Sequence, residues 1–144
     1  MMAGIRGKDT KPEIILRRGL HARGYRYQLH RRDLPGKPDL VFPRYRGVLF
    51  AQGCFWHGHQ CRLFKWPKTR NEFWRTKITQ NRDRDRTSSE KLRVAGWRIG
   101  EVWECALKGR SRLDVTEVLD RCEKWLLSSD PTLEVIGDET GLSL

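Results

Sequence analysis

Residues 34–51 read LPGKPDLVFPRYRGVLFA and contain two short apolar runs separated by a turn. Pro-Gly-Lys-Pro at 35–38 is a turn signal, and DLVF (39–42) has the length and composition of a buried strand. A second turn follows, and GVLFA (47–51) then has the composition of another buried strand. Two consecutive apolar strands predict the centre of a β-sheet, with Asp39 at the start of the first.

A helix is predicted before this strand pair. Thr10 and Glu13 have the spacing of a capping box, and Pro12 suits a first helical turn, so the helix is expected to run from this point to Gly24. Its buried stripe is expected to contain Ile14, Ile15 and Leu20.

After the strand pair, the sequence predicts a long basic helix and then another strand. Thr69 and Glu72 repeat the capping-box spacing, and no helix breaker follows before Gly96. WRIGEVWE (97–104) has the pattern of a strand, which ends at Cys105. Along the chain, the long helix would therefore connect two strands of the same sheet.

Two further segments complete the predicted fold. YRYQL (25–29) alternates like a strand, and residues 114–127 have the pattern of an amphipathic closing helix. The order of elements predicts an α/β protein with a central mixed β-sheet flanked by helices. We expect a single domain over residues 1–144, with a core at about 5–127 and a poorly ordered tail at 128–144.

The composition favours a polyanionic partner. The 144-residue chain has a formal net charge of +11, and the basic residues are spread along it. Neutralising phosphates releases counterions, so nucleic acid is the leading candidate, beside an ordinary basic protein or a protein that binds an anionic membrane surface. Without a run of roughly 18 to 20 apolar residues or a secretory signal, we expect a cytoplasmic protein that does not span a membrane. Composition does not separate DNA from RNA.

A cluster of cysteine and histidine residues suggests a metal site. Cys54, His59 and Cys61 lie within eight residues, and Cys105 follows a later strand. Three thiolates and one imidazole suit Zn²⁺, and four protein ligands would make the site structural. The alternatives are disulfides, which an intracellular setting disfavours, or buried thiols with a hydrogen-bonded His59. Cys122 is interpreted as a small buried hydrophobic residue in the closing helix.

Asp39 has two interpretations. A lone carboxylate at the start of a strand is commonly a turn or cap residue. However, Mg²⁺ needs few protein oxygens when water and a substrate phosphate complete its shell. A turn, an Asp at the start of a strand and then an apolar strand is also the order of elements in PD-(D/E)xK nucleases, although VLFAQ (48–52) lacks the acidic-x-Lys of that pattern.

Seven segments together resemble the very-short-patch-repair (Vsr) mismatch endonuclease family, and the resemblance covers about residues 5–127. These segments are TKPE (10–13), LPGKPDLVF (34–42), GCFWHGHQC (53–61), EFW (72–74), KITQNRDRD (77–85), GWRIGEVWECAL (96–107) and KGR (108–110). The resemblance implies a PD-(D/E)xK nuclease-like fold with a structural zinc site. It also implies Mg²⁺-dependent nicking of one DNA strand 5′ to the T of a T:G mismatch, which arises when 5-methylcytosine deaminates.

The resemblance also assigns the reacting groups. Asp39 corresponds to the Mg²⁺-binding carboxylate, Ala51 to a residue that binds the same ion through its backbone carbonyl, and His57 to the catalytic histidine. Glu13 matches a glutamate near the active site, and it either caps its helix only or also orders water bound to the metal. Gln52 stands where the family is expected to carry a second histidine, so a role in proton transfer there is in doubt.

The metal and DNA contacts follow in the same way. The expected zinc ligands are Cys54, His59, Cys61 and Cys105. Phe55, Trp56 and Trp74 correspond to aromatic residues that wedge into the duplex, whereas the alternative places them in the core. Apolar wedges cost a few kcal/mol of unstacking, which is least at a mismatch. The other expected DNA contacts are Gln52, Lys65, Arg70, Lys77 and Asn81.

The remaining expectations concern partners and alternatives. The substrate would be double-stranded DNA with a T:G mismatch, met by a monomer associated with the bacterial nucleoid. Mismatch-repair proteins and a repair polymerase are plausible collaborators, and DNA contacts from the family's N-terminal segment are expected to be weakened or absent. The alternatives are a protein that binds mismatched or distorted DNA without cutting it, and a zinc-stabilised RNA-binding or ribonuclease domain.

Overall fold

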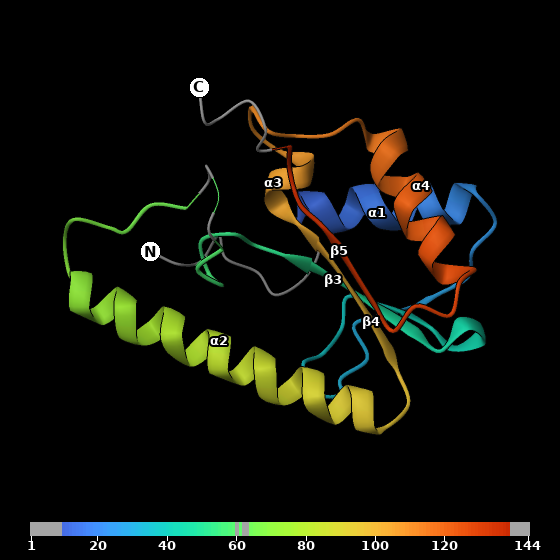
Figure 1. Ribbon diagram of the computed structural model, residues 1–144, viewed down its shortest axis with the longest axis horizontal. Coiled ribbons are helices and arrows are strands. Elements are labelled where there is room, and N and C mark those ends of the chain that lie inside the picture. The colour runs from blue at the N-terminus through green and yellow to red at the C-terminus, as the bar shows by residue number, and fades with distance from the viewer. Residues whose placement is uncertain (1–9, 60, 62–63, 139–144) are drawn as a thin grey trace.

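The computed structural model describes residues 10–59, 61 and 64–138, which form a five-stranded mixed β-sheet with helices on both faces (Figure 1). The strand order is β1-β2-β3-β4-β5; β1 to β3 pair antiparallel, and β3 to β5 pair parallel. The strands are β1 (Gln28–Leu29), β2 (Leu40–Phe42), β3 (Gly47–Gln52), β4 (Arg98–Trp103) and β5 (Thr132–Val135). The predicted mixed sheet is confirmed.

The helices form two outer layers. Helix α1 (Lys11–Ala22) and helix α4 (Val115–Leu126) pack on one face, and the long helix α2 (Asn71–Val94) lies on the other (Figure 1). Successive residues of β3 show the two faces, because Val48 packs with Leu92 of α2 whereas Leu49 packs with α1 and α4. The short elements are the 3₁₀ helix η2 (Pro43–Tyr45) and α3 (Glu104–Leu107).

The buried stripe of α1 differs from the prediction. Leu20 is buried as expected, but Leu16 takes the second core position and Ile14 and Ile15 are half-buried. Glu13 is also buried, with an exposure of 1%. An acidic side chain on the buried face of α1 therefore points to a site rather than to solvent.

The start of α2 also differs from the prediction. The helix begins after Arg70, which has a left-handed backbone (φ 55°), and no side-chain hydrogen bond caps it. The capping box expected from Thr69 and Glu72 is therefore wrong. Strand β1 is likewise shorter than residues 25–29, because Tyr25 and Tyr27 pack against the core instead of pairing in the sheet.

The described part of the segment after residue 128 contains a strand. It was expected to be poorly ordered, but it adds β5 to the edge of the sheet, parallel to β4. The carboxylate of Glu134 accepts a hydrogen bond from Trp103 Nε1 at 3.1 Å, and Val135 is fully buried. Residues 139–144 of the expected tail, and residues 1–9, lie outside the described part of the chain.

No helix in the described residues combines the length and apolar character needed to cross a membrane.

Candidate active site and metal centres

A cleft of about 530 Å³ lies where β2 begins and β3 ends. Because these strands are antiparallel, their paired ends meet at one edge of the sheet, and the Ala51 amide donates to Asp39 Oδ2 at 2.7 Å. His57, Phe55 and Trp56 from the following loop line the same cleft. The structure thus brings together the carboxylate, the backbone position and the histidine that the resemblance assigned to catalysis.

The carboxyl group of Asp39 is unusually hard to ionise. The residue is 8% exposed, and burial raises its pKa from 3.8 to about 7. The neighbouring Glu13 carboxyl adds to the rise, whereas the Ala51 N–H opposes it. A cation in the cleft would favour the ionised form, because an opposite charge at close range lowers the pKa of a carboxyl group.

Glu13 reaches the same site from the first turn of α1. Its amide donates to Thr10 Oγ1 at 3.4 Å, so the predicted cap is present. Its Oε2 accepts from Arg17 Nη1 at 2.9 Å and lies 2.7 Å from His30 Nε2. The backbone amide of Glu13 therefore belongs to the helix cap, while its carboxylate lies beside Asp39.

His30 is a site residue that the sequence did not reveal. One ligand-type atom each from Glu13, His30 and Asp39 lie within 4.8 Å of one another. His30 follows a two-residue strand in a polar stretch, QLHRRD, which carries no motif. Only the fold brings it next to α1.

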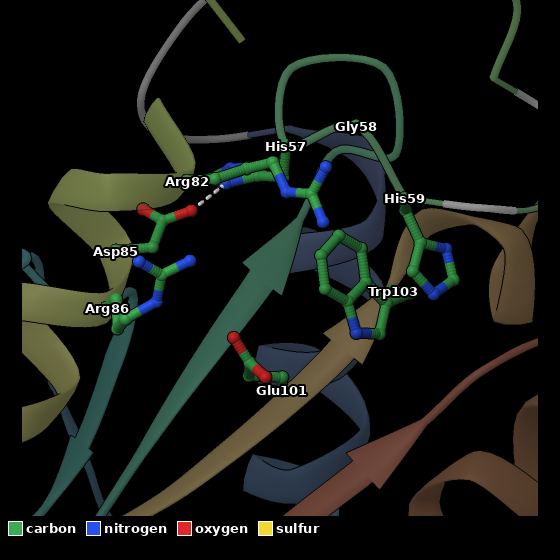
Figure 2. A pocket seen from close by; sticks show the side chains of 8 residues that line it. All are labelled: His57, Gly58, His59, Arg82, Asp85, Arg86, Glu101 and Trp103. Carbon is green, nitrogen blue, oxygen red and sulfur yellow. Dashed lines mark hydrogen bonds and ion pairs between the residues drawn. The ribbon is translucent and has the colours of Figure 1, made fainter. Parts of the chain in front are cut away.

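His57 is oriented by a carboxylate from α2. Its Nδ1 makes a short hydrogen bond with Asp85 Oδ2, and its ring meets Trp103 edge to face with 5.9 Å between centroids (Figure 2). With Nδ1 engaged by Asp85, Nε2 carries the lone pair in the neutral imidazole. This tautomer is suited to accept a proton.

Asp85 was also missed, although its position in α2 carried a signal. Trp74, Ile78, Asn81 and Asp85 are spaced 4, 3 and 4 residues apart and follow the inward face of α2, on which Leu92 is fully buried. The Asp85 side chain is 38% exposed, and an acidic residue on the inward face of a helix is uncommon. Sequence periodicity could have identified the carboxylate but not His57 as its partner.

A second cavity of about 500 Å³ adjoins His57 on the α2 side (Figure 2). Arg82 and Arg86 of α2 line it, as do Glu101 and Trp103 of β4. Burial raises the pKa of Glu101, which accepts a hydrogen bond from Gln52 Nε2 at 2.9 Å. His57 and Asp85 line both cavities.

Two of the predicted DNA contacts have their amides engaged within the protein. Gln52 is 8% exposed and its amide donates to Glu101. Asn81 Nδ2 donates to the backbone oxygen of Trp56 at 2.9 Å and so ties α2 to the loop that follows β3. Direct DNA contact by either side chain stays a prediction, whereas Lys65 and Arg70 are exposed and Lys77 is half-buried.

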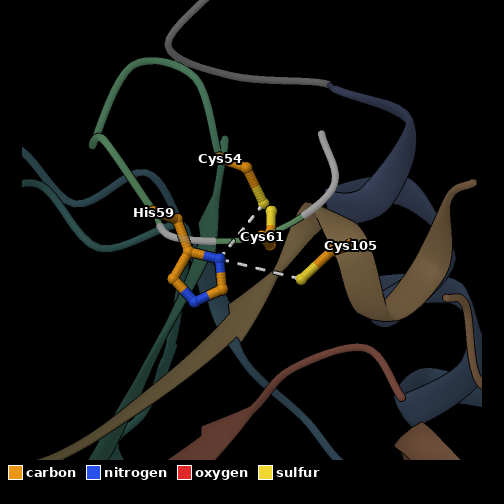
Figure 3. Close-up of side chains that lie close together, drawn as sticks. All are labelled: Cys54, His59, Cys61 and Cys105. Carbon is orange, nitrogen blue, oxygen red and sulfur yellow. Dashed lines mark hydrogen bonds between the residues drawn. The ribbon is translucent and has the colours of Figure 1, made fainter. Parts of the chain in front are cut away.

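The predicted cysteine and histidine side chains converge on one point (Figure 3). Ligand-type atoms of Cys54, His59, Cys61 and Cys105 lie within 4.8 Å of one another, and both Cys54 and Cys105 are fully buried. His59 Nδ1 lies 3.5 Å from Cys54 Sγ and 3.7 Å from Cys105 Sγ. A hydrogen bond from Cys54 lowers the pKa of Cys105 to about 6 and raises that of Cys54. The cluster could therefore bind a metal ion, and Cys122 packs separately in the core.

Neighbouring residues hold this cluster in place. The His59 ring stacks on Trp103 with centroids 4.0 Å apart, and the Gly137 amide donates to Cys105 Sγ at 3.3 Å. Gly58 has φ +61°, and a side chain there would meet Ile78 of α2 at 2.7 Å. The loop thus needs glycine at this position for its close approach to α2.

The predicted wedge residues form a half-exposed aromatic cluster outside the main cores. Phe55, Trp56 and Trp74 contact one another with centroids 5.1 to 5.4 Å apart. Phe55 also packs on Phe64, and the exposed ring of Phe73 packs on Trp74. The rings stabilise one another while keeping apolar surface at the rim of the cleft.

A buried carboxylate next to an Asp-paired histidine, in a cleft with an aromatic rim and a basic helix nearby, defines a hydrolytic nuclease. Comparisons with known proteins identify the family. The model of the family described as DNA mismatch endonuclease Vsr matches residues 1–63. DNA mismatch endonuclease Vsr of Escherichia coli (strain K12) is 41% identical over 143 residues, which are 99% of this chain and 90% of that protein.

Two nicking enzymes are similar as well. Type II nicking enzyme V.XorIIP of Xanthomonas oryzae pv. oryzae (strain KACC10331 / KXO85) is 49% identical over 114 residues, 79% of this chain and 84% of that protein. Type II nicking enzyme V.NmeAIP of Neisseria meningitidis serogroup A / serotype 4A (strain DSM 15465 / Z2491) is 40% identical over 111 residues, 77% of this chain and 79% of that protein. The chain belongs to the DNA mismatch endonuclease Vsr family and is a DNA endonuclease.

Proposed function

We propose that this chain is a Mg²⁺-dependent endonuclease that nicks one DNA strand 5′ to the T of a T:G mismatch, the lesion left when 5-methylcytosine deaminates. The observation that carries the proposal is the shared cleft, which Asp39, Ala51 and His57 line together with Phe55 and Trp56. Because the catalytic residues and the aromatic rings line the same cleft, a duplex that the rings can distort is also placed against the catalytic residues.

The donor atoms in the cleft fit Mg²⁺. Asp39 and the backbone carbonyl of Ala51 would hold the ion, because Mg²⁺ prefers a few hard oxygen ligands and keeps positions for water and phosphate oxygens. When bound, Mg²⁺ stabilises negative charge on the phosphate and on the departing 3′ oxygen. We propose a PD-(D/E)xK-like arrangement because β2 is followed by β3 along the chain and Asp39 stands at the start of β2.

His57 is the proposed general base. Its Nε2 takes the proton of the attacking water, while Asp85 holds Nδ1–H and stabilises the imidazolium that forms. The water oxygen bonds to phosphorus, the bond to the 3′ oxygen breaks and that oxygen takes a proton from solvent water, so the products carry a 5′ phosphate and a 3′ hydroxyl. Gln52 takes no part in proton transfer, because its amide is committed to Glu101.

The aromatic cluster is the proposed mismatch sensor. Inserting Phe55 and Trp56 between base steps costs a few kcal/mol, because the bases must unstack. This cost is smaller at a T:G mismatch than at an intact pair. Trp74 packs on both rings and supports them from α2. Lys65, Arg70 and Lys77 are proposed to contact flanking phosphates, which set position rather than sequence.

Zn²⁺ is the proposed occupant of the Cys54, His59, Cys61 and Cys105 cluster. Three thiolates and one imidazole leave no open position, so the ion would be structural. Mismatch-containing double-stranded DNA is the proposed partner. Contacts with mismatch-repair proteins and a repair polymerase, a monomeric state and a nucleoid-associated location stay predictions.

A nicking assay on end-labelled duplexes tests the function. We expect one nick 5′ to the T of T:G with Mg²⁺, none on matched T:A, and none with Asp39→Ala. A panel of flanking sequences reveals the required context. Tight Mg²⁺-independent binding to T:G duplex with no nick across the panel would instead favour a non-cleaving binding protein, and cleavage by Asp39→Ala would refute the assigned site.

A further inference from the structure

Three side chains from separate segments meet at the edge of the active-site cleft. Glu13 comes from α1, His30 from the loop after β1, and Asp39 from the residue before β2. Their ligand-type atoms lie within 4.8 Å of one another. In the described part of the chain, this trio and the four-residue cysteine and histidine cluster are the groups of at least three side chains that could hold an ion.

The backbone presents His30 to this site. His30 has φ 49°, a left-handed conformation that costs a non-glycine residue of order 1 kcal/mol or more. Its amide donates to the backbone oxygen of Asp39 at 3.2 Å, which fixes the loop against the start of β2. The fold therefore maintains an uncommon backbone conformation directly beside the carboxylate of the site.

The spacing of the side-chain atoms is that of ligands on one ion. His30 Nε2 lies 2.7 Å from Glu13 Oε2. Neighbouring ligands of an octahedral divalent ion, each about 2.1 Å from the metal, lie roughly 3 Å apart. Asp39 lines the cleft, and beside it the His30 imidazole is 22% exposed and the Glu13 side chain 1%.

We propose that His30 and Glu13 join Asp39 and the Ala51 backbone carbonyl as direct ligands of the catalytic cation, and that the His30 nitrogen makes the site prefer Mn²⁺ to Mg²⁺. Mg²⁺ binds oxygen ligands almost exclusively, whereas first-row transition ions accept imidazole readily. The inference rests on the proposed function, because it assumes that Asp39 holds the catalytic ion.

The substitution His30→Gln separates ligation from hydrogen bonding. The Gln amide can still donate to Glu13, but it offers no imidazole nitrogen to a metal. His21→Gln is the matched control, because His21 is exposed near the end of α1 and lies outside the trio. Mn²⁺ is the ion to use, since thiolate sites such as the cysteine cluster select softer metals.

The assay measures Mn²⁺ and Mg²⁺ binding by the zinc-loaded protein without DNA. Free Mn²⁺ is followed by electron paramagnetic resonance, Mg²⁺ by competition, and a coordinated nitrogen by electron spin echo modulation. We expect a ¹⁴N signal in the wild type that His30→Gln removes. The same change is expected to raise the Mn²⁺ Kd at least about tenfold and the Mg²⁺ Kd less than about threefold, whereas His21→Gln alters neither.

Two results would overturn the proposal. A His30→Gln protein that keeps the wild-type Mn²⁺ Kd would show that His30 only positions Glu13, and equal weakening of both ions would remove the predicted preference. Asp39→Asn distinguishes these failures from failure of the proposed function. If Asp39→Asn weakens Mn²⁺ binding and His30→Gln does not, the cation site stands without His30; if Asp39→Asn has no effect, the cation site itself is wrong.

Discussion

Replacing Asp39 by Asn is expected to stabilise the Mg²⁺-free protein while abolishing nicking. The carboxyl group is buried and accepts a hydrogen bond from the Ala51 amide. Asn retains an oxygen that can accept this hydrogen bond, but it carries no charge. The substitution therefore removes the cost of a buried charge with little change in packing.

The magnitude follows from the pKa of Asp39, which is 3.8 in its ordinary state and about 7 in the folded protein. A raised pKa means that the folded state binds the proton more tightly than the unfolded state. The wild type consequently has its full stability below pH 4 and loses it as the pH rises toward 7. At about 1.4 kcal/mol per pKa unit, the loss has an upper limit of ~4 kcal/mol above pH 7.

Urea unfolding of the two proteins at matched pH measures this difference. The zinc-loaded proteins are compared without added Mg²⁺ and without chelator, because a chelator would also remove metal from the cysteine cluster. We expect equal free energies of unfolding near pH 4 and a gap that widens to a few kcal/mol by pH 8, with Asp39→Asn the more stable. Added Mg²⁺ should stabilise the wild type and leave the variant unchanged.

The reasoning would be refuted if Asp39→Asn were no more stable than the wild type at pH 8. The charge at Asp39 would then be compensated by the protein itself, for example through the Arg17 side chain beside Glu13. A difference in the free energy of unfolding that did not depend on pH would also contradict the reasoning. It would indicate a packing effect rather than a titrating carboxyl group.

Three further substitutions test the loop and its metal. Cys105→Ala should abolish tight binding of one Zn²⁺, read by metal analysis, and lower the melting temperature by well over 10 °C, whereas the buried Cys122→Ala should keep the metal. Gly58→Ala should lower the free energy of unfolding by about 1–3 kcal/mol more than Gly24→Ala, because both have positive φ but only Gly58 lacks space for a side chain. Trp56→Ala should weaken binding to T:G duplex by about 1–3 kcal/mol in a fluorescence titration and leave the unfolding free energy less affected.

The parts of the site that come from residues close together in the sequence were predictable. A turn, a strand, a turn and a strand bring Asp39 and Ala51 together without information from elsewhere in the chain. The cysteine cluster could also be predicted, because three of its residues lie in one loop and the fourth lies two residues after β4, in α3. In both cases the chemistry is carried by residues close in sequence or by the end of a recognisable strand.

The missed residues depend on how distant elements pack. His30 reaches Glu13 across 17 residues, and Asp85 reaches His57 across 28, so neither pair follows from spacing. Strand β5 was missed because the polar and apolar residues of TLEV alternate over four residues only, which is a weak strand signal. Its place is set by pairing with β4 and by burial of Val135, which depend on the rest of the fold.

If the proposed Zn²⁺ occupies the cysteine and histidine cluster, the position of His57 between Cys54 and His59 implies that losing the ion stops nicking before the protein unfolds. Cys54 precedes His57 by three residues and His59 follows it by two, so both ends of this short segment are fixed by the cluster. From α2, Asn81 binds the backbone of Trp56, and Asp85 binds His57. If the cluster releases its ion, His57 keeps these contacts from α2, the hydrogen bond from its amide to the Gly53 oxygen and its ring contact with Trp103, but both ends of the segment lose their anchors. Because even a 1 Å displacement of a reacting group can cost about a hundredfold in rate, nicking should fail at chelator concentrations that leave the helical circular dichroism signal intact.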